Sequence, residues 1–124
     1  MPQTMEIPRE RWEQTLATFS ERNVGRPVRL EVATAPGEGG PLLAEHQPLL
    51  GIDFDAKGSE APAVEIAVGS GSGARQQNLT HVIHNPAQIW LEQEVDGLGI
   101  ALKITSRDDE ATTVLFEREP ALTS

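Results

Sequence analysis

The sequence predicts an α+β fold, with one N-terminal amphipathic helix packed on a curved, mainly antiparallel sheet or open barrel of six to seven strands. Two observations favour this class. Apolar residues recur with the period of a helix near the N-terminus, and after Gly25 the period changes to two, which is typical of half-buried strands. The connections between alternating segments, such as Asp96-Gly97 and the polar residues 106–111, are too short for a crossover helix. Neighbouring strands joined in this way must be antiparallel.

The helix is expected over about residues 8–23. Trp12, Leu16 and Phe19 follow one another at i, i+4 and i+7, so they share one face. An apolar stripe with this spacing is typical of a helix that packs on a core rather than of a ligand groove. Gly25 can supply the left-handed residue that ends the helix.

Strands are expected from about residue 27 to residue 117, and the whole chain, residues 1–124, is expected to form a single domain. Apolar and polar residues alternate in each candidate strand. The candidates centre on residues 28–32, 50–54, 64–68, 79–83, 89–91, 100–104 and 112–116. Residues 34–48 and 69–78 are rich in Gly, Pro, Ser and Gln, and we expect them to be loops.

Composition removes several classes of function. The chain has no cysteine, which excludes zinc fingers, redox pairs and a thiolate nucleophile. The charged N-terminus lacks the apolar region of a secretory signal, and no apolar run approaches the ~20 residues that would span a bilayer. We therefore expect a soluble, cytoplasmic protein, and no motif calls for a cofactor.

The net charge of −9 is unevenly distributed. Residues 1–30 hold five Arg and four Glu, whereas the rest of the chain holds five Lys and Arg against fifteen Asp and Glu. An acidic body repels phosphate backbones and anionic lipid surfaces, because affinity for them comes largely from clustered Lys and Arg. We therefore expect neither nucleic acid nor a membrane as a partner.

His81 and His84 lie three positions apart in the stretch LTHVIHNPAQIWLE. The spacing resembles a pair of metal ligands, but residues three apart on a strand point to opposite faces. The two imidazoles therefore cannot reach one ion unless a bulge intervenes, and the sequence marks no third ligand. We expect no metal, with His81 as a half-buried histidine hydrogen-bonded to a neighbour and His84 as a residue of the turn at Asn85-Pro86.

Carboxylates are the other candidate groups. Asp53 and Asp55 open a stretch that resembles a calcium loop, but Lys57 occupies a position where that loop needs an oxygen ligand. They are more simply the solvent side of a strand, and the alternative is a carboxylate pair for acid/base work. The Gly-Ser stretch at residues 69–75 lacks the Lys-Ser/Thr ending of a phosphate loop, and no helical pattern follows it.

Three longer segments carry a resemblance. EIPRERWEQTLATFSE, LTHVIHNPAQIWLEQE and ALKITSRDDEATTVLFE, in this order, resemble a family of small uncharacterised bacterial proteins catalogued as a domain of unknown function. The likeness runs from about Glu6 to Phe116. It implies a bacterial origin and a single domain, and it assigns no activity and no site residue.

Two functions follow as hypotheses. The first is a non-enzymatic binding or interaction module, whose protein partner or second copy would pair with an exposed sheet edge. The alternative is a small-ligand or enzymatic pocket, with His81 and one or two of Asp53, Asp55 and Glu65 as weak catalytic candidates. The sequence favours the first, because it offers no catalytic constellation.

Overall fold

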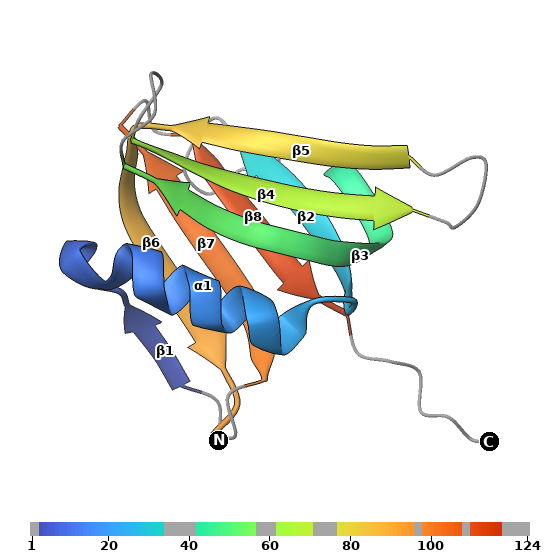
Figure 1. Ribbon diagram of the computed structural model, residues 1–124, viewed down its shortest axis with the longest axis horizontal. Coiled ribbons are helices and arrows are strands. Elements are labelled where there is room, and N and C mark those ends of the chain that lie inside the picture. The colour runs from blue at the N-terminus through green and yellow to red at the C-terminus, as the bar shows by residue number, and fades with distance from the viewer. Residues whose placement is uncertain are drawn as a thin grey trace.

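The computed structural model describes residues 3–33, 42–56, 62–70, 77–95, 98–107 and 110–117. It confirms the predicted class, with one N-terminal helix packed on an open antiparallel sheet that has eight strands in this part of the chain (Figure 1). The elements in chain order are β1 (Gln3–Glu6), a 3₁₀ turn (Arg9–Arg11), α1 (Trp12–Asn23), β2 (Pro27–Ala33), β3 (Leu42–Asp55), β4 (Ala63–Ser70), β5 (Gln77–His84), β6 (Pro86–Gln93), β7 (Gly99–Ser106) and β8 (Ala111–Phe116).

The strand order is β1-β6-β7-β8-β2-β3-β4-β5, and every neighbouring pair is antiparallel. β3 belongs to both halves of the sheet, because its first part pairs with β2 and its second part, from Leu49 on, pairs with β4. Within the first part, His46 has a positive φ of 57° and lies at the register shift between the pairs Val28–Gln47 and Leu30–Ala44. The section β3-β4-β5 crosses over the section β2-β8-β7-β6 (Figure 1).

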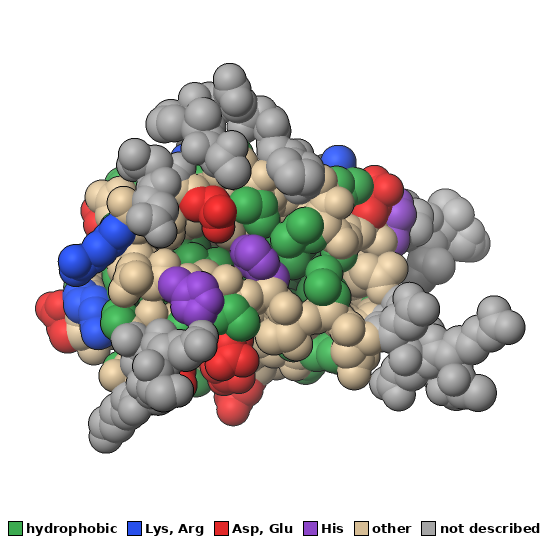
Figure 2. Space-filling model, turned by 90° about the horizontal axis from the view of Figure 1, so that it is seen from above, with side chains coloured by type: hydrophobic (Ala, Val, Ile, Leu, Met, Phe, Trp, Pro, Cys, Tyr) green, Lys and Arg blue, Asp and Glu red, His purple; other side chains and the backbone are tan. Residues whose placement is uncertain are grey.

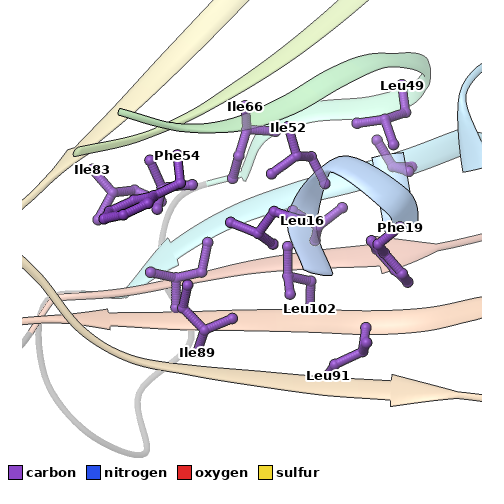
Figure 3. Close-up of a cluster of buried hydrophobic side chains, with 14 of the residues drawn as sticks. Leu16, Phe19, Leu49, Ile52, Phe54, Ile66, Ile83, Ile89, Leu91 and Leu102 are labelled. Atoms are coloured by element: carbon purple, nitrogen blue, oxygen red, sulfur yellow. The ribbon is translucent and has the colours of Figure 1, made fainter. Parts of the chain in front are cut away.

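The predicted apolar face of α1 is confirmed, since Trp12, Leu16 and Phe19 are all buried. In Figure 3, Leu16 and Phe19 point from the helix into the space between the two sections of the sheet. Ile52 comes from the upper section and Leu102 from the lower one, and both are fully buried. The alternating residues of the strands and the helix stripe therefore fill one core.

The helix also covers a sheet edge. The second part of β3 pairs with β4 on one side, and on the other side the backbone N–H of Ile52 donates to Oγ of Ser20 on α1, with 3.0 Å between the atoms. Gly25, whose φ of 89° ends the helix, donates its N–H to the carbonyl of Leu49, and the N–H of Leu49 donates to the carbonyl of Arg26. The backbone groups of this edge are thus bonded to α1 and its exit turn.

A single residue, Asn85, joins β5 to β6. Its φ of 52° is one that asparagine tolerates better than most residues. Its N–H donates to the carbonyl of Pro62, and its own carbonyl accepts from the N–H of Arg107. Because β5 and β6 lie near opposite ends of the strand order, Asn85 ties the two ends of the sheet together at one corner.

Three sequence predictions need correction. The loop predicted at 69–78 was too long, because residues 69–70 belong to β4 and residues 77–78 to β5; residues 71–76 lie outside the described residues. The strand count of six to seven was too low, because β1 was not expected; it is only four residues long and exposed throughout, so it has no alternating pattern. The predicted loop at 34–48 was wrong over residues 42–48, which form the first part of β3; residues 34–41 lie outside the described residues. None of the helices described is long and apolar enough to cross a membrane.

Candidate functional site

The last strand of the sheet, β5, has a long regular edge. It pairs with β4 in an unbroken register from Ala63–His84 to Ser70–Gln77, and no other strand of the described residues pairs with it. Proteins usually protect such an edge with a proline, a lysine, a bulge or a very short strand. β5 has eight residues and none of these devices. We call the side of residues 78–83 that faces away from β4 the β5 edge.

His81 lies on this strand and faces the inside of the folded-over sheet, on the same side as the buried Ile83. Its imidazole is half-buried, and Nε2 lies 3.3 Å from Oγ1 of Thr112 on β8. The setting expected for His81 is therefore confirmed. Burial lowers the pKa of His81 below its ordinary value of 6.5, while the charge of nearby Glu110 acts in the opposite direction. The imidazole is thus mainly neutral at pH 7.

The carboxylates singled out from the sequence lie elsewhere. Asp53 and Glu65 are exposed and directly opposite each other on β3 and β4, on the outer face of the sheet. Glu65 precedes Ile66, which is buried and pairs with His81, so Glu65 and His81 point to opposite faces. Asp55 lies on the outer face too, in the same row of the sheet as His84. The structure therefore does not bring His81 together with these carboxylates.

A groove of about 610 Å³ adjoins the β5 edge. It lies between the first part of β3 and the beginning of β5. Leu43, Val68 and Leu79 supply its apolar lining, and Glu45 and Asn78 are among its polar residues. Figure 2 looks onto this side of the molecule, where histidine and apolar side chains gather near the centre and acidic side chains lie on either side.

The chemistry available around His81 is limited. Thr112 is only 1 % exposed, so its hydroxyl is not accessible to a substrate of any size. Within the described ranges, no three His, Asp or Glu side chains are grouped closely enough to hold a metal ion. The groove exposes two large apolar side chains, Leu43 and Leu79, beside polar ones, a composition suited to contact with another chain.

Glu110, Thr112 and Leu43 were not singled out from the sequence. Glu110 lies in the polar turn before β8, and Thr112 belongs to that strand, so they approach His81 only because the sheet folds over. Leu43 fell within the predicted loop. Its neighbours Leu42 and Ala44 are apolar as well, so no alternation marked it.

Comparison with protein-family models matches residues 3–124 to one family, described as a family of unknown function, DUF5335. No curated protein and no solved structure shows a significant match.

Proposed function

The chain belongs to DUF5335, a family of unknown function, and we propose that it is a non-enzymatic interaction module that binds an extended segment of a partner protein along the β5 edge. The observation that carries this proposal is the contrast between β5 and two other sheet edges in the described part of the chain. β5 is long, regular and unprotected, whereas the second part of β3 is covered by α1 and β1 has only four residues.

Strand addition needs two things from a receiving edge. One is a row of backbone groups in extended conformation, which supplies affinity without regard to sequence. β5 offers this row over residues 78–83, and it carries no Asp, Glu, Lys or Arg that would resist an approaching strand. The other is a recess for alternate side chains of the added strand, which supplies specificity. The groove lined by Leu43 and Leu79 lies beside the edge and has an apolar lining.

The enzymatic alternative has less support. His81 is a neutral imidazole beside the buried hydroxyl of Thr112, and Asp53 and Glu65 lie on the other face of the sheet. Four pockets formed by described residues are lined by residues other than His81. A general base needs a substrate within hydrogen-bond distance, so this geometry favours a structural role for His81.

The test is a selection of random peptides displayed on phage against the purified protein, followed by fluorescence anisotropy with the selected peptides. We expect peptides with alternating apolar residues. Val82→Lys, which places a cation at an exposed position of β5, should weaken their binding by about tenfold or more. Val95→Lys is the matched control, because Val95 is exposed in the turn after β6 and should leave binding unchanged.

Hydrogen exchange then locates the bound peptide. Amides of residues 78–83 should be protected in the complex, and those of β1 should not. Equal binding by wild type and Val82→Lys, or protection that avoids β5, would overturn the proposal. Sedimentation of the protein alone covers self-association, since a dimer that Val82→Lys dissociates would make a second copy the partner at the same edge.

A further inference from the structure

Two of the basic side chains of α1 and of the 3₁₀ turn before it lie on a different side of the helix from the acidic ones. Arg11 and Arg22 lie eleven residues apart, about three helical turns, and Thr15 and Thr18 lie between them at i+4 and i+7. These four side chains therefore form one stripe along the helix, which we call the arginine stripe. The acidic residues Glu10, Glu13 and Glu21 fall outside this stripe by the same helical spacing.

The arginine stripe forms one wall of a groove of about 360 Å³. Met5 of β1 and Leu91 of β6, which pair with each other, line it from the inner face of the sheet. Glu6 also lines the groove and is its one carboxylate among the described residues. Two cations against one anion give this groove a positive charge on a chain whose net charge is −9.

The arginines of the stripe differ from the other arginines near them. Arg9 stacks over the rings of Trp12 and Phe54, and Arg26 donates to Asn23 and to the carbonyl of Gly99. Among the described residues, Arg11 and Arg22 form no ion pair and no side-chain hydrogen bond. Their guanidinium groups are thus available to an anionic ligand, and arginine is well suited to binding carboxylates in a bidentate manner.

We infer that this groove binds an acidic peptide segment in extended conformation, with two carboxylates that pair with Arg11 and Arg22. Eleven residues at 1.5 Å each separate the two positions by roughly 16 Å along the helix. An extended chain covers that distance in about five residues, so the two acidic residues should lie about four to six positions apart. A small dicarboxylate is too short to reach both arginines.

Charge also favours an acidic peptide over a nucleic acid as the ligand of this groove. A polyanion would continue beyond the groove over an acidic protein surface and would be repelled there. A short segment with two carboxylates needs only the groove itself. The apolar floor at Met5 and Leu91 suits the uncharged residues between the two carboxylates.

The groove and the β5 edge are separate surfaces. The groove is lined by residues of β1, α1 and β6, whereas β5 lies at the other end of the strand order. The inference therefore stands even if the β5 edge binds nothing, and the two can be tested one at a time.

The probe is a small set of fluorescein-labelled peptides of about a dozen residues. Each peptide has two glutamates about four, five or six positions apart, and its other side chains are uncharged. Fluorescence anisotropy at low salt measures their binding to the full chain. We expect at least one peptide to bind, and replacement of both glutamates by glutamine should weaken binding by about tenfold or more. Added salt should weaken it as well.

Variants locate the site. Arg11→Gln and Arg22→Gln should each weaken binding by about fivefold, and the double variant should abolish it. Arg107→Gln is the matched control, because it removes the same charge from an exposed position in the turn after β7. Val82→Lys should leave this binding intact. Thermal midpoints that match wild type would show that the variants are folded.

Three results would overturn the inference. The first is that no peptide of the set binds at millimolar protein. The second is that the double variant binds as tightly as wild type or that Arg107→Gln weakens binding equally, since the effect would then reflect total charge. The third is that a single-stranded RNA oligomer displaces the peptide and binds more tightly, since the groove would then be a phosphate site.

Discussion

The second part of β3 and the β5 edge each have backbone N–H and C=O groups that no neighbouring described strand binds on one side. They differ in how these groups are covered. At β3 the N–H of Ile52 donates to Ser20, and the backbone of Leu49 is bonded on both sides to the turn after α1. At β5 no described strand or helix plays that part. This contrast within the described residues is the basis of the proposal that a partner segment pairs with β5.

The cover over β3 depends on a buried asparagine at the end of α1. Asn23 is completely buried; its Nδ2 donates to the carbonyl of Phe19, and its Oδ1 accepts from Arg26 and from the N–H of Gly99. One side chain thus connects the last turn of α1 to β7 and to the turn that pairs with β3. The polar groups around it are satisfied only while the asparagine is present.

Asn23→Ala should have the largest effect. It leaves the N–H of Gly99 and one guanidinium contact of Arg26 without their acceptor, and we expect the free energy of unfolding to fall by about 3 kcal/mol. Urea denaturation measures the loss. The backbone amides of β3 should exchange faster than in wild type, and those of β5 should change less. Asn78→Ala, at an exposed position of β5, should alter stability by no more than about 0.5 kcal/mol; equal losses in the two variants would contradict the contrast.

Ser20→Ala should have the next largest effect. It removes the acceptor of the Ile52 N–H while keeping the helix, so the loss should be about 1 to 2 kcal/mol, as for other buried groups that lose a hydrogen bond. Thr18→Ala, on the exposed side of the same helix, serves as the control. Thermal and urea unfolding of both variants would reveal the difference. Equal stability of the two would mean that the hydroxyl is not needed to satisfy this edge.

The smallest effect is a pH dependence at β5. The pKa of His81 is lowered by burial, so the unfolded chain takes up a proton at a higher pH than the folded chain does. The contribution of His81 to stability is therefore complete above about pH 6.5, its ordinary pKa, and is lost as the pH falls from there through the lower pKa of the folded state. Thermal midpoints should decrease more for wild type than for His81→Asn between neutral pH and about pH 5.5. Parallel curves would show that His81 is not buried as described.

Periodicity predicted most of the fold. The stripe of Trp12, Leu16 and Phe19 and the alternation in seven strands are direct consequences of burial on one face, so they are readable from the sequence. β1 could not be predicted, because a short strand with every residue exposed leaves no pattern. The first part of β3 was hidden by Pro41, Pro48 and the glycines before it, whose composition is that of a loop.

The candidate sites were less predictable for a different reason. His81 was correctly expected to be half-buried because it shares a face with Ile83. Its neighbours are Thr112 from β8 and Glu110 from the turn before β8, and their position depends on how the sheet folds over, which no local pattern specifies. The arginine stripe is the opposite case. The spacing of Arg11, Thr15, Thr18 and Arg22 was present in the sequence, and only the groove that gives it a role needed the structure.

The corner at Asn85 also bears on how the chain reaches this fold. Two strands joined by one residue would ordinarily form a hairpin, yet β5 and β6 lie far apart in the strand order and do not pair with each other. The hairpins that can form early are therefore β2-β3-β4-β5 and β6-β7-β8, two local blocks of consecutive antiparallel strands. They are joined through β2, whose Val28 pairs with Phe116 near the other end of the described chain. Closing that loop carries a large entropy cost, so docking of the two blocks, rather than formation of either one, should limit the rate of folding.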